Sequence, residues 1–160
     1  MWAVQDNGDL LSLTYMKEHQ IWGWARHTTE GRFTQVVSIP GDNSDSVYAT
    51  VVRTINGVDK YFLERMQPYW DRTKGIENTF YVDSGLIFSF EEDVSEVSGL
   101  QHLEGHVVNG VIDGKAFTGL TVTEGKIQLP FSGKHIITGL PYIGELEPVS
   151  YTHLTLPTKA

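Results

Sequence analysis

Turn-forming residues interrupt this chain about every ten positions, and this spacing restricts the possible folds more than any other feature. Short runs rich in β-branched and aromatic residues lie between the turns, and such runs favour strands. Asn56 and Gly57 separate two of these runs. This pair is the strongest short signal for a β-hairpin, because both residues tolerate positive φ. No segment keeps the helical period of about 3.6 residues. The sequence therefore predicts an all-β, antiparallel fold with at most one short helix, near 67–75.

The predicted strands fall into two groups. Residues 1–66 are expected to form an antiparallel meander that resembles propeller blades, with one four-stranded sheet, the start of a second and a boundary in the loop 40–46. Residues 99–148 are expected to form a small β-barrel-like module. The segment 67–98 is interpreted as a connection with one or two strands, and its acidic part 90–99 as a loop or surface edge. The predicted strands are 2–4, 10–16, 21–27, 33–39, 47–55, 58–66, 80–85, 106–114, 120–130 and 134–142.

Charge and composition exclude several classes of protein. The formal charge is −8, from 12 basic and 20 acidic side chains, whereas a surface that coats nucleic acid depends on Lys and Arg. The chain has no cysteine, which removes disulfides, thiolate zinc sites and thiol nucleophiles. No apolar run approaches the roughly 20 residues that span a bilayer. Nucleophile elbows, phosphate-binding glycine loops and dinucleotide fingerprints are absent from the sequence, so neither catalytic residues nor a cofactor is expected.

The motif HLEGH at 102–106 places two histidines four positions apart around Glu104. On a helix, this spacing would bring both imidazoles to one face, where they could bind zinc. However, the glutamate is not where the metalloprotease pattern H-E-x-x-H requires it, and Gly105 disfavours a helix. We therefore expect surface or edge histidines near a turn, and no metal site.

Two acidic segments, 40–46 and 90–98, are predicted to contact neighbouring chains in an assembly. The first lacks the complete calcium-binding loop pattern, so we interpret it as a solvated loop. The second could supply paired acids for glycoside hydrolysis, but nothing in the sequence places a partner carboxylate across a cleft. An exposed charged edge is the better interpretation. The candidate contact residues are Asp42, Asn43, Asp45, Glu91, Glu92 and Asp93.

Trp22 and Trp24 alternate along one predicted strand, so both rings are expected on the same side of a sheet. With Trp2 and Tyr15 nearby, they could form a platform on which sugars stack. More often, such aromatic side chains fill the space between packed sheets, and we therefore predict core packing. A carbohydrate- or receptor-binding module remains the alternative. Exposed tryptophans would favour that alternative, and buried tryptophans would exclude it.

Several stretches read together resemble one protein family. They are WAVQDNGDLLSLTY (2–15), IWGWARHTTEGRF (21–33), VVRTINGVDKYFLERM (51–66) and VDSGL (82–86). They resemble the tail tubular protein B, or nozzle, family of short-tailed bacteriophages and related prophages. The later stretches SGLQHLEGHVVNGVIDG (98–114), LTVTEGKIQLP (120–130) and ITGLPY (137–142) continue the resemblance.

The later stretches also resemble a module named after the first-catalytic-cysteine half-domain (FCCH) of ubiquitin-activating enzymes. The enzyme activity in that name is not implied here, because the chain has no cysteine. His106 departs from the motif, in which Lys is expected at this position. This departure further weakens a metal-binding interpretation of HLEGH.

The resemblance implies a structural protein of the virion tail, made in the cytoplasm of the bacterial host. It implies a ring-shaped homo-oligomer that contacts other tail subunits and through which DNA leaves the capsid. An acidic wall would repel phosphate, so DNA is expected to pass without specific binding. Neither catalysis nor a cofactor is implied.

The segment 149–160 begins with VSYTHLTLPT, which is the translation of a common sequencing-library transposon adapter. We interpret this segment as non-native and expect its deletion to leave stability unchanged. A genuine β-tail is the alternative, because Thr and Leu alternate at 154–156. Members of the family that the chain resembles are longer, so the chain is expected to be an internal piece of such a protein.

Overall fold

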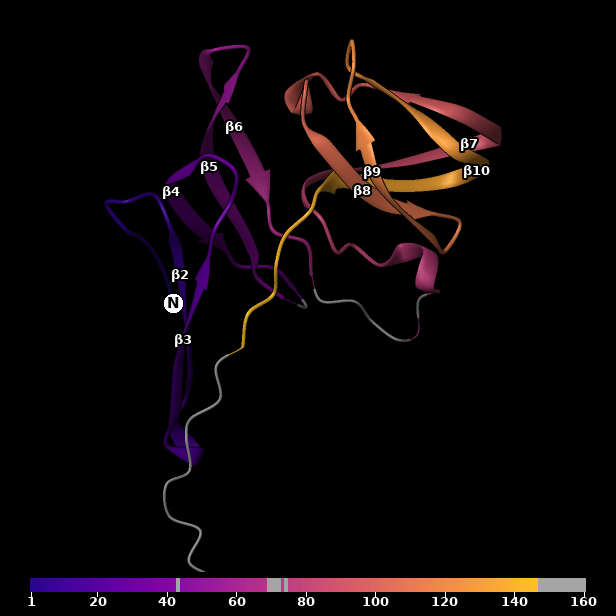
Figure 1. Cartoon of the computed structure of the whole chain (residues 1–160). Coiled ribbons are helices and arrows are strands. Elements are labelled where there is room, and N and C mark those ends of the chain that lie inside the picture. The colour runs from indigo at the N-terminus through magenta and orange to yellow at the C-terminus, as the bar shows by residue number, and fades with distance from the viewer. Residues whose placement is uncertain (43, 69–72, 74, 147–160) are drawn as a thin grey trace, which may run out of the picture.

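A computed structural model of the protein describes residues 1–42, 44–68, 73 and 75–146. These residues form ten strands in three antiparallel sheets, with three short 3₁₀ helices and no α-helix (Figure 1). The all-β prediction is confirmed. The strands are β1 (Trp2–Val4), β2 (Leu10–Met16), β3 (Ile21–His27), β4 (Arg32–Ile39), β5 (Ser46–Ile55), β6 (Val58–Arg65), β7 (Asp83–Ser98), β8 (Val107–Ile112), β9 (Lys115–Thr121) and β10 (Lys126–Leu140). The 3₁₀ helices are η1 (Lys17–His19), η2 (Ile76–Asn78) and η3 (Gln101–Leu103).

Two predictions concern segments outside these ranges. The segment 149–160, interpreted as non-native, lies wholly outside the described residues. The short helix expected near 67–75 lies partly outside them, and the 3₁₀ helix η2 follows that segment. The hydroxyl of Thr79 donates to the Ile76 carbonyl at the end of η2 (2.5 Å).

The first 66 residues form two three-stranded sheets, ordered β1-β2-β3 and β4-β5-β6. The predicted four-stranded sheet with a boundary at 40–46 is wrong, because that loop joins β4 to β5 within one sheet. The chain changes sheets between β3 and β4 instead. Gly31 in this crossing has a φ of 130°, and a Cβ atom there would overlap the Val52 carbonyl. Only glycine fits both the conformation and the space.

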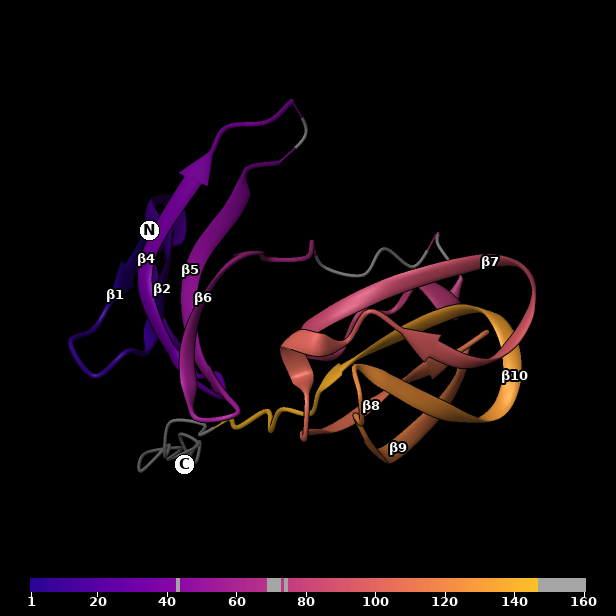
Figure 2. The ribbon, with the colours of Figure 1, turned by 90° about the horizontal axis from the view of Figure 1, so that it is seen from above.

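The β4-β5-β6 sheet lies between the other two sheets, and we call it the middle sheet (Figures 1 and 2). On one side, the backbone N–H of Phe33 donates to the turn after β1 (2.9 Å). On the other side, the rings of Phe62 and His102 approach with centroids 6.2 Å apart. Val51 and Val52 point to opposite faces of β5, and both are buried. The middle of this sheet is therefore covered on both faces.

The second module is a four-stranded sheet in the order β7-β10-β8-β9, and it coils strongly (Figure 2). Because β7 pairs with β10, this sheet starts at Asp83, inside the segment interpreted as a connection. Strands β7 and β9 remain edges in the described part of the chain, so the barrel-like prediction is not met by a closed barrel. Its core consists of Val97, Leu100, Leu103, Val108, Ile112, Phe117, Val122, Ile127, Leu129, Ile136 and Leu140.

Apolar burial differs between the two parts of the chain. Among the described residues of the first two sheets, the buried apolar side chains are Leu10, Ala49, Val51, Val52 and Ile55. Many large apolar side chains of the first 66 residues are exposed instead: Met1, Tyr15, Met16, Ile21, Trp22, Trp24, Val37, Ile39, Val58, Tyr61, Leu63 and Met66. The module thus has a closed interior, with Leu86, Ile87, Phe90 and Val107 exposed outside it, while the first two sheets bury few apolar side chains and expose many.

Candidate functional site

The β2–β3 hairpin carries three exposed aromatic rings on one face of its sheet. Tyr15 lies opposite Trp22, and Leu13 lies opposite Trp24. Opposite residues point to the same side, and so do alternate residues of one strand. Tyr15, Trp22 and Trp24 are 61%, 67% and 56% exposed. The prediction of core packing is wrong for these three, because no described segment covers this side. We call them the aromatic face.

Trp2 lies on the opposite side of the same sheet. Its cross-strand partner is Ser12, which precedes Leu13 and therefore points away from the aromatic face. The Trp2 and His27 rings lie 5.5 Å apart, and Ser12 Oγ lies 2.9 Å from His27 Nε2. Partial burial lowers the pKa of His27, because desolvation disfavours the imidazolium. Trp2 is half-buried and does not join the aromatic face.

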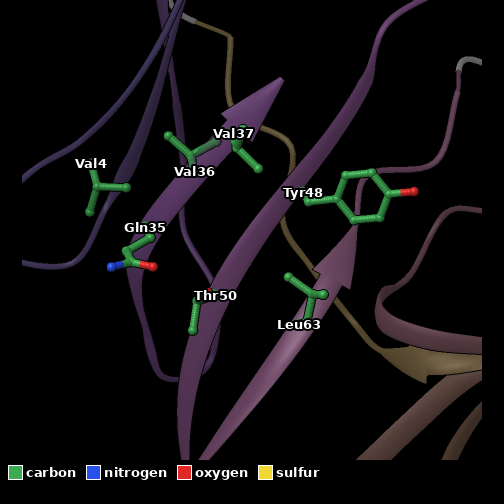
Figure 3. A pocket seen from close by; sticks show the side chains of 7 residues that line it. All are labelled: Val4, Gln35, Val36, Val37, Tyr48, Thr50 and Leu63. Carbon is green, nitrogen blue, oxygen red and sulfur yellow. The ribbon is translucent and has the colours of Figure 1, made fainter. Parts of the chain in front are cut away.

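An open hollow of about 500 Å³ lies on the β4-β5-β6 sheet (Figure 3). Thr50 in β5 pairs with Gln35 on one side and Leu63 on the other, so these three side chains share a face. Leu63 is 74% exposed. We call this feature the sheet hollow, and its lining residues are Val4, Gln35, Val36, Val37, Tyr48, Thr50 and Leu63.

The predicted contact loop 40–46 connects the two strands that carry much of the sheet hollow. Asp42 and Asp45 are exposed in this loop. The hydroxyl of Ser38 donates to Asp45 Oδ2 (3.4 Å). Asn43 lies outside the described residues. The structure therefore places two acidic side chains on the connection between β4 and β5.

Glu91, Glu92 and Asp93 lie in strand β7, so the interpretation of this segment as a loop is wrong. Their expected exposure at a sheet edge is confirmed. The register between β7 and β10 shifts at these acids, which lie opposite Lys134. The Lys134 ammonium donates to the Glu91 carbonyl (2.6 Å). Such an irregularity interrupts the alternation that identifies a strand in sequence.

The two histidines of HLEGH have different partners. Nε2 of His102 lies 3.0 Å from the Ser84 carbonyl oxygen, whereas Nε2 of His106 lies 3.2 Å from Glu30 Oε1. Both histidines are half-buried and lie on either side of the turn at 104–105. Nowhere in the described ranges do three His, Asp or Glu side chains cluster in a way that could hold a metal. His106 thus connects the module to Glu30, and the His102 ring lies near Phe62 of β6, whereas the contact between His102 and Ser84 lies within the module.

The glutamate of HLEGH stabilises a turn. The two carboxylate oxygens of Glu104 accept the backbone N–H groups of Glu124 (2.9 Å) and Gly125 (2.6 Å). Glu124 has a φ of 54° and Gly125 a φ of 69°. The carboxylate thus pairs two backbone donors of the tight turn before β10.

Sequence reasoning missed the polar contacts between the middle sheet and the module. Arg53 in β5 is 3% exposed, and its guanidinium donates to Glu64 and to the Glu30 carbonyl. Glu64 also accepts a hydrogen bond from Ser84 in β7 (2.9 Å). The only available signal was one arginine inside a run of β-branched residues. We call this group the polar seam; it comprises Thr29, Glu30, Arg53, Glu64, Asp83, Ser84, His102 and His106.

No protein-family model and no curated protein matches this chain. No helix in the described ranges is long and apolar enough to cross a membrane.

Proposed function

We propose that this chain is a structural subunit of an oligomer and acts through its surfaces, without catalysis. The observation that carries this proposal is the unequal covering of its sheets. The module has a closed apolar core, whereas the aromatic face and the sheet hollow expose large apolar side chains. Monomeric soluble proteins rarely expose contiguous apolar patches above a few hundred Å². Neighbouring protein would remove these faces from water.

Within this class, we propose a subunit of the tail nozzle of a short-tailed bacteriophage, located in the virion tail. The resemblance of 2–15, 21–33, 51–66 and 98–114 to the nozzle family supports this assignment. The subunit would form a ring-shaped homo-oligomer beside other tail proteins. The formal charge of −8 suits a conduit, because a negative wall repels the phosphates of passing DNA.

The test is the oligomeric state of the full chain. Light scattering after size-exclusion chromatography over a wide concentration range should show an oligomer that grows with concentration. Electron microscopy of that oligomer should show closed rings. A protein that stays monomeric at every concentration would contradict the proposal.

A carbohydrate-binding module is the second candidate, and the exposure of Trp22 and Trp24 favours it. Two exposed indole rings on one strand face could stack against sugar rings. Titration with bacterial cell-wall polysaccharides would then quench the tryptophan fluorescence. Replacing both tryptophans by alanine should abolish polysaccharide retention in a pull-down, whereas Tyr61→Ala, an exposed aromatic on another sheet, should not.

A further inference from the structure

We propose that copies of this chain associate head to tail, with the aromatic face of one copy packed in the sheet hollow of the next. This inference rests on the proposed oligomer and specifies which surfaces form its contact. The occupant of the sheet hollow is therefore a second copy of this chain. The hairpin that carries the aromatic face projects beyond the middle sheet (Figure 1).

One chain cannot fill its own sheet hollow with its own aromatic face. Val4 lines the hollow, and its cross-strand partner Leu10 is 1% exposed. The face of the first sheet that carries these two residues therefore looks toward the middle sheet. Trp24 lies on the reverse face and points away. Two surfaces that face apart in one molecule can meet only between two molecules.

The exposed apolar area is close to the apolar area that a stable interface buries. An aromatic side chain offers about 200 Å², so the exposures of Tyr15, Trp22 and Trp24 leave roughly 370 Å² of ring surface. Leu63 and Val37 in the hollow are 74% and 52% exposed. A standard interface buries about 800 Å² per partner, of which somewhat more than half is apolar. The exposed area of the aromatic face is thus close to the apolar area of such an interface.

The charges beside the two surfaces offer one complementary pairing between copies. Lys17 is exposed at the tip of the hairpin, next to Glu18, whereas Arg26 on β3 already pairs with Asp9 at 3.7 Å. Asp42 and Asp45 stand exposed on the loop that joins the strands of the hollow. Opposite charges at the rim of an interface favour the correct partner and register. This places the predicted contact loop 40–46 at the edge of the proposed interface.

The two contacting surfaces differ, so the contact is heterologous. Repetition of such a contact closes into a ring when the rotation between copies allows it, and otherwise forms a filament. A face-to-face contact between two aromatic faces would instead give a closed dimer. The geometry of the contact therefore determines the kind of oligomer.

Two variants of the full chain separate these possibilities. Trp22→Ser/Trp24→Ser removes the aromatic face, and Val37→Asp/Leu63→Asp places charge in the sheet hollow. All four side chains are more than half exposed, so both variants should fold, as circular dichroism would verify. Each variant alone should be monomeric. An equal mixture should give a one-to-one heterodimer, because one intact aromatic face then meets one intact hollow.

The matched control is Tyr142→Ser, which changes an aromatic side chain that is 55% exposed elsewhere in the chain. It should keep the wild-type oligomer. A second pair of variants tests the charges at the edge of the proposed interface. Lys17→Glu and Asp45→Lys should each weaken association several-fold, and mixing the two variants should partly restore association.

Other outcomes would overturn the inference in distinguishable ways. If only the aromatic-face variant became monomeric, the contact would be a symmetric one between aromatic faces. If both variants kept the wild-type oligomer, the contact would lie elsewhere, although the proposed subunit role would stand. If the wild-type chain were monomeric and its fluorescence were quenched by polysaccharide, sugar would occupy the aromatic face, and the oligomer proposal would fail as well.

Discussion

The guanidinium of Arg53 donates to both carboxylate oxygens of Glu64, at 2.9 and 3.1 Å, while its side chain is only 4% exposed. The pair joins β5 to β6 inside the middle sheet. Asp83 Oδ2 lies 3.7 Å from the same guanidinium and belongs to β7. One buried cation therefore connects three strands of two sheets. The two carboxylates are only about a quarter exposed, so removing the guanidinium would leave two partly buried negative charges without their cation, which is costly.

Replacement of Arg53 by alanine should therefore destabilise the protein strongly. We expect the free energy of unfolding to fall by about 3 kcal/mol, measured by urea denaturation. Arg32→Ala is the control, since Arg32 pairs with Asp59 at 3.2 Å where both side chains are about half exposed. Arg32→Ala should lower the free energy of unfolding by less than about 1 kcal/mol. Equal losses of unfolding free energy in the two variants would show that Arg53 in the polar seam contributes no more to stability than an exposed ion pair.

Gly110 is predicted to be intolerant of any side chain. A Cβ atom there would overlap both the Ile137 carbonyl and the Phe117 ring inside the module. Gly110→Ala should lower the free energy of unfolding by about 2 kcal/mol, because overpacking displaces neighbours. At Gly23, in β3, nothing lies within 4 Å of a new Cβ atom. Gly23→Ala should leave stability unchanged or raise it by about 0.5 kcal/mol. An unchanged free energy of unfolding in Gly110→Ala would contradict the close packing around Gly110.

The carboxylate of Asp113 should make stability depend on pH in the acid range. The backbone N–H groups of His135 (2.9 Å) and Lys134 (3.1 Å) donate to it and lower its pKa. A carboxyl group with a lowered folded-state pKa stabilises the fold above its unfolded pKa of about 3.9. That contribution is lost as pH falls through the folded-state pKa.

The test compares the wild type with Asp113→Asn, because asparagine also tolerates the φ of 47° at this position. Urea denaturation from about pH 7 to about pH 2 should show a stability difference that is largest near neutrality and shrinks in acid. A difference that stays constant across this range would exclude the carboxylate charge as its cause.

The two parts of the chain should respond separately to core substitutions. Ile136 belongs to the closed core of the module, whereas Val51 belongs to the β4-β5-β6 sheet, where few apolar side chains are buried. We expect calorimetry to show two transitions, with the first 66 residues melting at the lower temperature. Ile136→Ala should reduce the midpoint temperature of the upper transition, and Val51→Ala that of the lower transition. Each change should reduce the free energy of unfolding by about 2 kcal/mol. A single transition shifted by both variants would contradict this separation.

DNA should not adhere to this protein. With 12 basic against 20 acidic side chains, few cations are available to displace counterions from phosphate. Fluorescence anisotropy of labelled duplex DNA at low salt should therefore stay unchanged on addition of the full chain. Tight binding that weakens with salt would refute the non-adhesive wall of the proposed conduit.

Much of the local structure could be predicted from the sequence alone. The predicted strands 10–16 and 21–27 coincide with β2 and β3, and the Asn56-Gly57 turn joins β5 to β6. The acidic part of β7 could not be predicted, because its strand character comes from pairing with β10 about forty residues later. A charged segment without alternation gives no local sign of such a partner.

The sequence by itself determined the all-β class, the turns and most strand boundaries, because these depend on neighbouring residues and on side-chain alternation. Only the tertiary structure decided which strands share a sheet, that Trp22 and Trp24 stand in water, and that Arg53 is buried at a seam. Side-chain type indicates a preference for burial. Whether another layer covers that side chain depends on contacts between residues far apart in the chain, and these do not appear in any local pattern.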